Sequence, residues 1–427
     1  MKKIIVVVAL VVLAGVRAFA QPSKEVASRI DQVAALFRDN PTGYDTLFTS
    51  GFLAEVPADR LTAIFSPYYT SYGKIVGWNY IDSSHQWSAK ARLRTSKHYT
   101  IELTIDLADS GSHLIDGLLL GLASPELKSL AEVRNKFAKM RGVTAMMIAR
   151  LQDDGKIVPI EEYNPDTALA IGSAFKLYVL ATLLKDINAG KRHWDDVIVL
   201  DSASRSFPSG QMHEWPVGTP VTLATAAAMM ISISDNTAAD LLIHTLGREH
   251  VEAMLSEAGN SHADLDKPFL TTQEAFKLKE TNHDLGSRYI TLSQEKKRAF
   301  LDREVAPFPH DSIGHVEGLI DKVEWFASPR DIANVYKYIL EHSKSGEGAK
   351  VRGILAINPG LSIDKSRWDY VGYKGGSEPG VLNMSFLLHS KLNGGWYVIT
   401  ASWNDAGAPL KDTQFYGIVQ RMIELAQ

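Results

Sequence analysis

The sequence predicts a small α+β domain followed by a larger α/β domain in which helices flank an antiparallel sheet. With 427 residues, the chain is longer than one ordinary hydrophobic core supports, so two domains are expected. In the larger part, strand-like segments stand at both ends and a long helical region lies between them. This order is typical of one sheet that is built from both ends of a domain.

The first twenty residues are predicted to be a cleavable secretory signal peptide. Lys2 and Lys3 precede an apolar run over 4–13, and Ala18-Phe19-Ala20 forms a small-x-small cleavage pattern. The run is too short for a comfortable membrane span, so we expect no stable membrane anchor after cleavage. An uncleaved N-terminal anchor is the alternative. We therefore expect a periplasmic or secreted bacterial protein.

Composition argues against several other classes of function. The chain contains no cysteine, which excludes disulfides, thiol catalysis and thiolate metal sites. The formal net charge is −4 and no dense basic run is present, so nucleic acid is not an expected partner. His213, His244 and His250 lack the spacing of a metal site, and we expect no metal and no other cofactor.

Residues 22–125 are predicted to form the small α+β domain. Two amphipathic helices, over 28–37 and from Pro57 to Phe65, precede strand-like segments over 75–80, 98–107 and 113–122. Alternation of polar and apolar residues in the second of these segments indicates a half-buried antiparallel sheet. We interpret the basic cluster of Lys90, Arg92, Arg94 and Lys97 as a solvated strand face. A role near the cleft of the next domain is the alternative.

Residues 127–427 are predicted to form the larger domain. A helix over 127–141 leads into a hairpin of 144–151 and 157–160, and a helical region from 173 to about 254 follows. Near its end the chain has three strand-like segments, over 371–373, 381–389 and 396–403. A final helix is predicted over 413–425.

A serine and a lysine stand one turn apart in Ser173-Ala174-Phe175-Lys176, at the start of a strongly apolar helix. Their spacing places hydroxyl and amine on one helix face, where a desolvated, neutral lysine can take the serine proton. Burial of an unpaired ammonium costs on the order of 3 kcal/mol or more, so a lysine on the inner face needs a role. A helix N-cap serine and a snorkelling lysine are the alternatives. Two further S-x-x-K patterns, at Ser293 and Ser362, have no such apolar helix behind them.

Two further motifs follow in order. Ser234-Asp235-Asn236 precedes a helix that is expected over 237–246, which these residues would also suit as a simple cap. Lys374-Gly375-Gly376 stands in a late strand-like segment, where glycine lets a strand come close to a ligand.

The three ordered motifs resemble those of the class A β-lactamase and penicillin-binding group of serine hydrolases, over roughly residues 127–427. The resemblance implies that Ser173 is the nucleophile and Lys176 its proton acceptor. Ser234 would relay the proton to the leaving group with help from Lys374.

The same resemblance implies a set of residues that bind the substrate. Asn236 would hydrogen-bond the substrate amide and help to fix Lys176, while Gly376 would let the strand approach. The backbone N–H groups of Ser173 and Ser377 would form the oxyanion hole.

The sequence departs from the family pattern at two places. Gly375 stands where the family usually has threonine or serine, whose hydroxyl binds the substrate carboxylate, unless Ser377 substitutes for it. An E-x-x-L-N loop, which carries the base for deacylation, is absent from the sequence. Glu274 is the nearest acid, and we interpret it as part of the solvated face of an amphipathic helix.

Residues 22–125 resemble the NTF2-like, steroid-isomerase-type domains in arrangement, and the pairing resembles a two-domain β-lactamase-like protein of clavulanate biosynthesis. The sequence therefore predicts an exported serine hydrolase that acts through acyl-Ser173 on a β-lactam or a related amide or ester. A penicillin-interacting esterase or DD-peptidase-like protein is the first alternative. A non-catalytic module that binds cell-wall fragments is the second.

Overall fold

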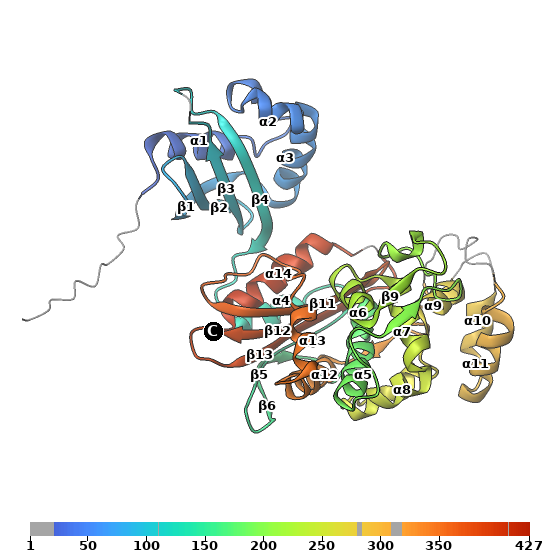
Figure 1. Ribbon diagram of the computed structural model, residues 1–427. Helices are drawn as coiled ribbons and strands as arrows, with labels where there is room; N and C mark the ends of the chain where they lie inside the picture. The colour runs from blue at the N-terminus through green and yellow to red at the C-terminus, as the bar shows by residue number, and fades with distance from the viewer. Residues whose placement is uncertain (1–20, 110, 280–283, 309–317, 409) are drawn as a thin grey trace, which may run out of the picture. The chain divides into compact units, whose positions relative to one another are not determined.

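The computed structural model describes residues 21–109, 111–279, 284–308, 318–408 and 410–427 (Figure 1). The predicted signal peptide, residues 1–20, lies outside the described residues. Within the described ranges, no helix is both long and apolar enough to cross a membrane. The chain divides into two compact units, of which the first ends at Glu126 and the second begins at Leu127.

The first unit packs helices against an antiparallel sheet with the strand order β1-β2-β3-β4. Its elements are α1 (Lys24–Ala35), α2 (Ser50–Glu55), α3 (Ala58–Tyr72), β1 (Ile75–Asp82), β2 (Ser88–Thr95), β3 (Tyr99–Leu107) and β4 (Ile115–Pro125). Ile101, Leu103 and Ile105 of β3 are fully buried, as the alternation predicted. Lys90 and Arg92 of β2 face outward, and each forms a 3.0 Å ion pair with Glu102 on β3.

The second unit contains a five-stranded antiparallel sheet with the order β11-β12-β13-β5-β6. Its strands are β5 (Val143–Leu151), β6 (Ile157–Tyr163), β11 (Trp368–Glu378), β12 (Val381–Ser390) and β13 (Trp396–Asn404). Strands from both ends of the unit thus share one sheet, which confirms the predicted fold class. β11 is an edge strand, so one of its sides is left for the helical part of the unit.

Helices cover both faces of this sheet (Figure 1). α4 (Leu130–Ala138) and α14 (Asp412–Leu425) pack together through Phe137 and Phe415, whose ring centroids are 6.1 Å apart. On the other face, α12 (Pro329–His342) packs between the sheet and α5 (Lys176–Asn188). α5 is almost completely buried, because its side chains are apolar on nearly every side.

The helical region that the sequence predicted from 173 to about 254 is interrupted, so that prediction was wrong for 189–222. Two short paired strands, β8 (Val197–Val199) and β9 (Pro220–Thr222), lie in this segment. Several glycines and prolines there, among them Gly190, Pro208 and Gly218, prevent a continuous helix. The other helices used below are α6 (Leu223–Ser232), α7 (Asn236–Leu246), α8 (Arg248–Glu257), α9 (Thr272–Lys279) and α13 (Lys350–Leu355).

Candidate active site

Ser173 and Lys176 lie at the junction of a 3₁₀ turn, Gly172–Phe175, and helix α5. Ser173 is partly exposed, whereas Lys176 is completely buried. The Lys176 Nζ atom lies 3.2 Å from Ser173 Oγ. The spacing of three residues therefore brings hydroxyl and amine into contact, as the first motif predicted.

The Lys176 amine is held by two groups that can only accept hydrogen bonds. It donates to the carbonyl oxygen of Ser234 at 2.6 Å and to Asn236 Oδ1 at 2.7 Å. A neutral amine has two hydrogens, which these two oxygens use. Its single lone pair can then accept from one hydroxyl at a time, that of Ser173 or that of Ser234, both at 3.2 Å.

Burial lowers the pKa of Lys176 to about 7. The desolvation of the ammonium is the main cause, and the negative charges of Asp240 and Asp235 act in the opposite direction. Near neutral pH, a large fraction of Lys176 is therefore unprotonated. This fraction can accept a proton from a neighbouring hydroxyl.

The second motif forms a tight corner between α6 and α7. Ser234 has a left-handed backbone with φ of 58°, which turns its hydroxyl toward the two lysines. Asp235 points away and caps α7 by accepting from the N–H of Ala238 at 2.9 Å. Asn236 also donates from Nδ2 to the carbonyl oxygen of Phe207 at 3.0 Å, which fixes its orientation toward Lys176.

Lys374 reaches the same corner from strand β11. Its Nζ lies 3.0 Å from Ser234 Oγ and 2.5 Å from the carbonyl oxygen of Gly375. Burial lowers the pKa of Lys374 well below its usual value, and the charge of Lys176 lowers it further. The Ser234 hydroxyl thus stands between two buried amines.

The backbone of β11 lies directly against the turn that carries Ser173. A Cβ atom on Gly376 would lie 2.1 Å from the carbonyl oxygen of Ile171 and 2.5 Å from Ser173 N, so only glycine fits there. The amide nitrogen of Ser377 lies beside the same turn, 3.3 Å from the position of a Cβ on Gly172. The side chain of Ser377 is exposed.

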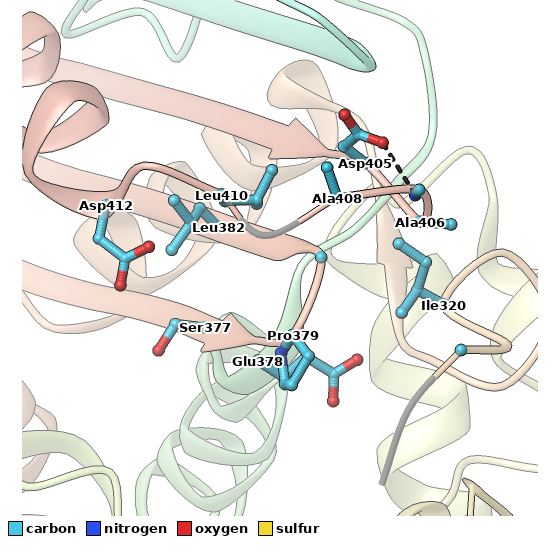
Figure 2. A pocket seen from close by; sticks show the side chains of 13 residues that line it. Ile320, Ser377, Glu378, Pro379, Leu382, Asp405, Ala406, Ala408, Leu410 and Asp412 are labelled. Carbon is cyan, nitrogen blue, oxygen red and sulfur yellow. Dashed lines mark hydrogen bonds between the residues drawn. The ribbon is translucent and has the colours of Figure 1, made fainter.

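These residues surround one cavity of about 280 Å³. Ser173, Ser234, Asn236, Lys374, Gly376 and Ser377 line it, and Lys176 lies beneath Ser173. The structure therefore brings all seven predicted site residues together. A neighbouring cavity of about 860 Å³ shares Ser377 and opens along the end of β11 (Figure 2).

Residues 128–301 match a family profile described as "Beta-lactamase enzyme family". The second unit is β-lactamase-like. The chain has no match among the curated proteins with which it was compared.

Several solved structures are similar to the β-lactamase-like unit. The β-lactamase of Sphaerobacter thermophilus is 20% identical, with a TM-score of 0.48, over 68% of this chain and 94% of that chain. The β-lactamase of Burkholderia phymatum is 17% identical, with a TM-score of 0.49, over 70% and 97%. PBP-A is 14% identical, with a TM-score of 0.45, over 69% and 94%.

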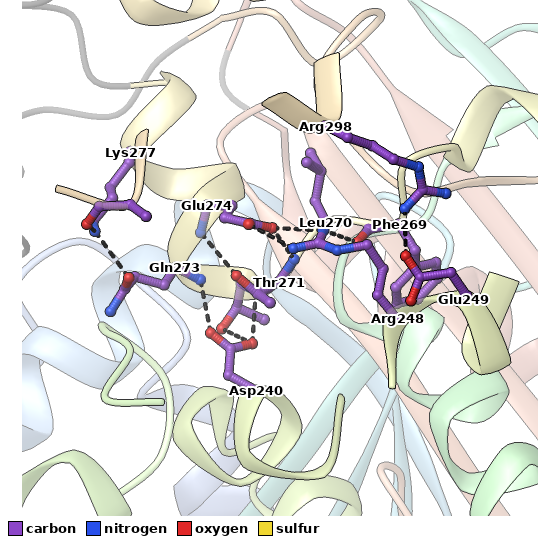
Figure 3. A network of polar contacts seen from close by, with 12 residues as sticks. Asp240, Arg248, Glu249, Phe269, Leu270, Thr271, Gln273, Glu274, Lys277 and Arg298 are labelled. Atoms are coloured by element: carbon purple, nitrogen blue, oxygen red, sulfur yellow. Dashed lines mark hydrogen bonds and ion pairs between the residues drawn. The ribbon is translucent and has the colours of Figure 1, made fainter. Parts of the chain in front are cut away.

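Glu274 in the β-lactamase-like unit is buried and paired, so its interpretation as part of a solvated face was wrong. Its carboxylate accepts from both terminal nitrogens of Arg248, at 2.7 and 2.9 Å, and from the N–H of Thr271 at 2.9 Å (Figure 3). Arg248 is the first residue of α8, and its guanidinium occupies the side of Glu274 that the spacing indicated as solvated. From the same helix α9, the side chain that lines the cavity beside Ser173 is Phe276.

Sequence reasoning missed Asp240, a fully buried carboxylate one turn beyond Asn236 on α7. It accepts from Thr272 N at 2.7 Å, Thr272 Oγ1 at 2.8 Å and Gln273 N at 2.9 Å, and so fixes the start of α9 (Figure 3). Burial raises the pKa of Asp240 to about 7. The available signal was an acid four residues after Asn236, on the same helix face.

Within the ranges that the structure describes, no group of three or more histidine, aspartate or glutamate side chains could hold a metal ion. The described residues that line the cavity beside Ser173 include no aspartate, glutamate or histidine. The chemistry that this part of the β-lactamase-like unit offers is therefore that of hydroxyls, amines and backbone N–H groups.

Proposed function

We propose that the protein is an exported serine hydrolase that acts through an acyl-Ser173 intermediate on a β-lactam or a related amide or ester. The observation that carries the proposal is the contact of Lys176 Nζ with Ser173 Oγ at 3.2 Å, with the amine hydrogens directed to two carbonyl-type oxygens. Export rests on the predicted signal peptide.

The arrangement supports a balanced acylation step. As Ser173 Oγ attacks the substrate carbonyl carbon, its proton passes to the lone pair of Lys176. The negative charge that develops on the carbonyl oxygen would be stabilised by the N–H groups of Ser173 and Ser377. The proton then passes through the Ser234 hydroxyl, which lies 3.2 Å from Lys176 and 3.0 Å from Lys374, to the leaving nitrogen or oxygen.

We further propose that hydrolysis of the acyl-enzyme is slow. Release of the acyl group needs a base that activates water. The acid nearest in sequence, Glu274, is held by Arg248, and Phe276 faces the cavity instead. This observation favours the penicillin-interacting esterase or DD-peptidase-like alternative over efficient β-lactam turnover.

The non-catalytic alternative has less support. A buried lysine costs several kcal/mol relative to an apolar residue of similar size, on the order of 3 kcal/mol or more. A module that only binds wall fragments has no need of two such amines, Lys176 and Lys374, beside one serine hydroxyl.

The test is a time course of intact mass after the mature protein is mixed with a penicillin, with Ser173→Ala as the control. A persistent adduct on Ser173 supports acylation with slow release. An adduct that forms and disappears while the drug is consumed supports a β-lactamase with another water activator. If neither a penicillin nor an activated ester labels the protein, or if Ser173→Ala is labelled equally, the proposal is wrong.

A further inference from the structure

Tyr373 of β11 lines the catalytic cavity, one residue before Lys374. Two glycines leave the space that its side chain occupies. A Cβ on Gly375 would lie 2.2 Å from the Tyr373 hydroxyl oxygen, and a Cβ on Gly360 would lie 2.6 Å from its Cε1. Phe386 packs against the ring with centroids 4.8 Å apart. The hydroxyl therefore has a defined position above Gly375.

The Tyr373 hydroxyl makes no hydrogen bond to any residue that the structure describes. The side chain is partly buried and lines the cavity, so a ligand that enters the cavity can supply a partner for the hydroxyl. Burial raises the pKa of Tyr373 above its usual value. At neutral pH the group is therefore a phenol that can donate.

The wall around this hydroxyl is rich in donors. Lys374, Ser234 and Ser377 line the same cavity, and acids are absent from its described lining. A lining of donors without acids favours a substrate group that accepts several hydrogen bonds, and a carboxylate, with two acceptor oxygens, is the strongest such group. Gly375 has no side chain with which to contribute to such a site.

We propose that the Tyr373 hydroxyl donates a hydrogen bond to a carboxylate of the substrate and thereby selects anionic acyl donors. This inference rests on the proposed function, because the carboxylate belongs to the molecule that acylates Ser173. The tyrosine reaches over Gly375 from the preceding position on the same strand face, so a hydroxyl is present although residue 375 carries none.

The test compares a penicillin with a free carboxylate and the methyl ester of the same penicillin. Initial rates of Ser173 acylation are measured by intact mass for the unaltered protein and for Tyr373→Phe, which keeps the ring and its packing. We expect the unaltered protein to prefer the free acid. In Tyr373→Phe, acylation by the free acid should fall about 10- to 100-fold, while acylation by the ester stays within about twofold.

Tyr397→Phe is the matched control, because the Tyr397 hydroxyl accepts from Asn393 in a hairpin turn at the end of β12 and β13. It should leave both rates unchanged. Equal losses for acid and ester in Tyr373→Phe, or an unchanged preference, would overturn the inference. So would an unaltered protein without preference for the acid, a result that needs no variant. If neither probe acylates the unaltered protein, the inference is overturned; the proposed function then fails as well only if an activated ester also leaves Ser173 unlabelled.

Discussion

Lys176 Nζ lies 2.7 Å from Asn236 Oδ1, inside the protein and away from solvent. This hydrogen bond joins the start of α5 to the start of α7, so the first and second motifs share one polar centre. The same amine touches Ser173. Its protonation state therefore decides whether the serine can react.

The acylation rate should depend on pH through Lys176. Because burial lowers the pKa of Lys176 to about 7, the neutral amine becomes the major form as the pH rises above that value. We expect the rate of adduct formation to rise between about pH 6 and about pH 8 and then to level off. Intact-mass rates across this range check the expectation. A rate that is flat there, or that climbs only near the pKa of an ordinary lysine, would contradict it.

Asp240→Asn should shift this pH profile to lower pH. Because burial raises the pKa of Asp240 to about 7, Asp240 is partly ionised near the midpoint of the profile. Its negative charge is the largest influence that raises the pKa of Lys176, so its removal should lower that pKa. The measurement is the midpoint of the pH–rate profile, with the exposed Asp264 replaced by asparagine as the control. A purely structural role would reduce the rate at every pH and leave the midpoint in place.

Glu274→Gln should destabilise the protein without lengthening the life of the acyl-enzyme. The change leaves Arg248 without its charged partner, and breaking a buried pair costs on the order of 3 kcal/mol. Urea unfolding gives the loss of stability, and intact mass gives the lifetime of the adduct. Glu249→Gln is the comparison, because this exposed partner of Arg298 should contribute less than about 1 kcal/mol. A much longer-lived adduct in Glu274→Gln would identify Glu274 as the base after all.

Gly376→Ala should abolish acylation, because the new methyl group would displace the turn of Ser173 by way of Ile171 O and Ser173 N. Gly353→Ala, on α13, is the matched control, since a Cβ there meets no atom within 4 Å. The measurement is the rate of Ser173 labelling in both variants at equal folded fraction. Normal labelling of Gly376→Ala would show that the close approach of β11 is not needed.

The sequence was sufficient for the parts of the site that depend on local spacing. Ser173 and Lys176 are one helical turn apart, and the strand-like segments near the end of the chain indicated the sheet that holds Lys374. The residue types of the second motif indicated a helix start, which α7 confirms.

The sequence was insufficient where two distant segments decide the environment of a side chain. The spacing in α9 suggested that Glu274 faces water, but Arg248 from α8 covers it. Asp240 becomes significant only because the chain returns after 32 to 33 residues to place Thr272 and Gln273 on its carboxylate. Tyr373 could be recognised only when Gly360, from outside the strand, was found against its ring.

Gly360, Tyr373 and Gly375 form a set of positions that cannot vary independently. A larger residue at either glycine collides with the tyrosine, and at 375 its hydroxyl is the nearest obstacle, ahead of the carbonyl oxygen of Asn383 at 2.8 Å. An evolutionary path toward a threonine or serine at 375 therefore has to begin with a smaller residue at 373. The intermediate would lack both the Tyr373 hydroxyl and the hydroxyl of a threonine or serine at 375. Such a lineage must therefore pass through a stage of weaker selectivity for anionic substrates before the hydroxyl at 375 restores it.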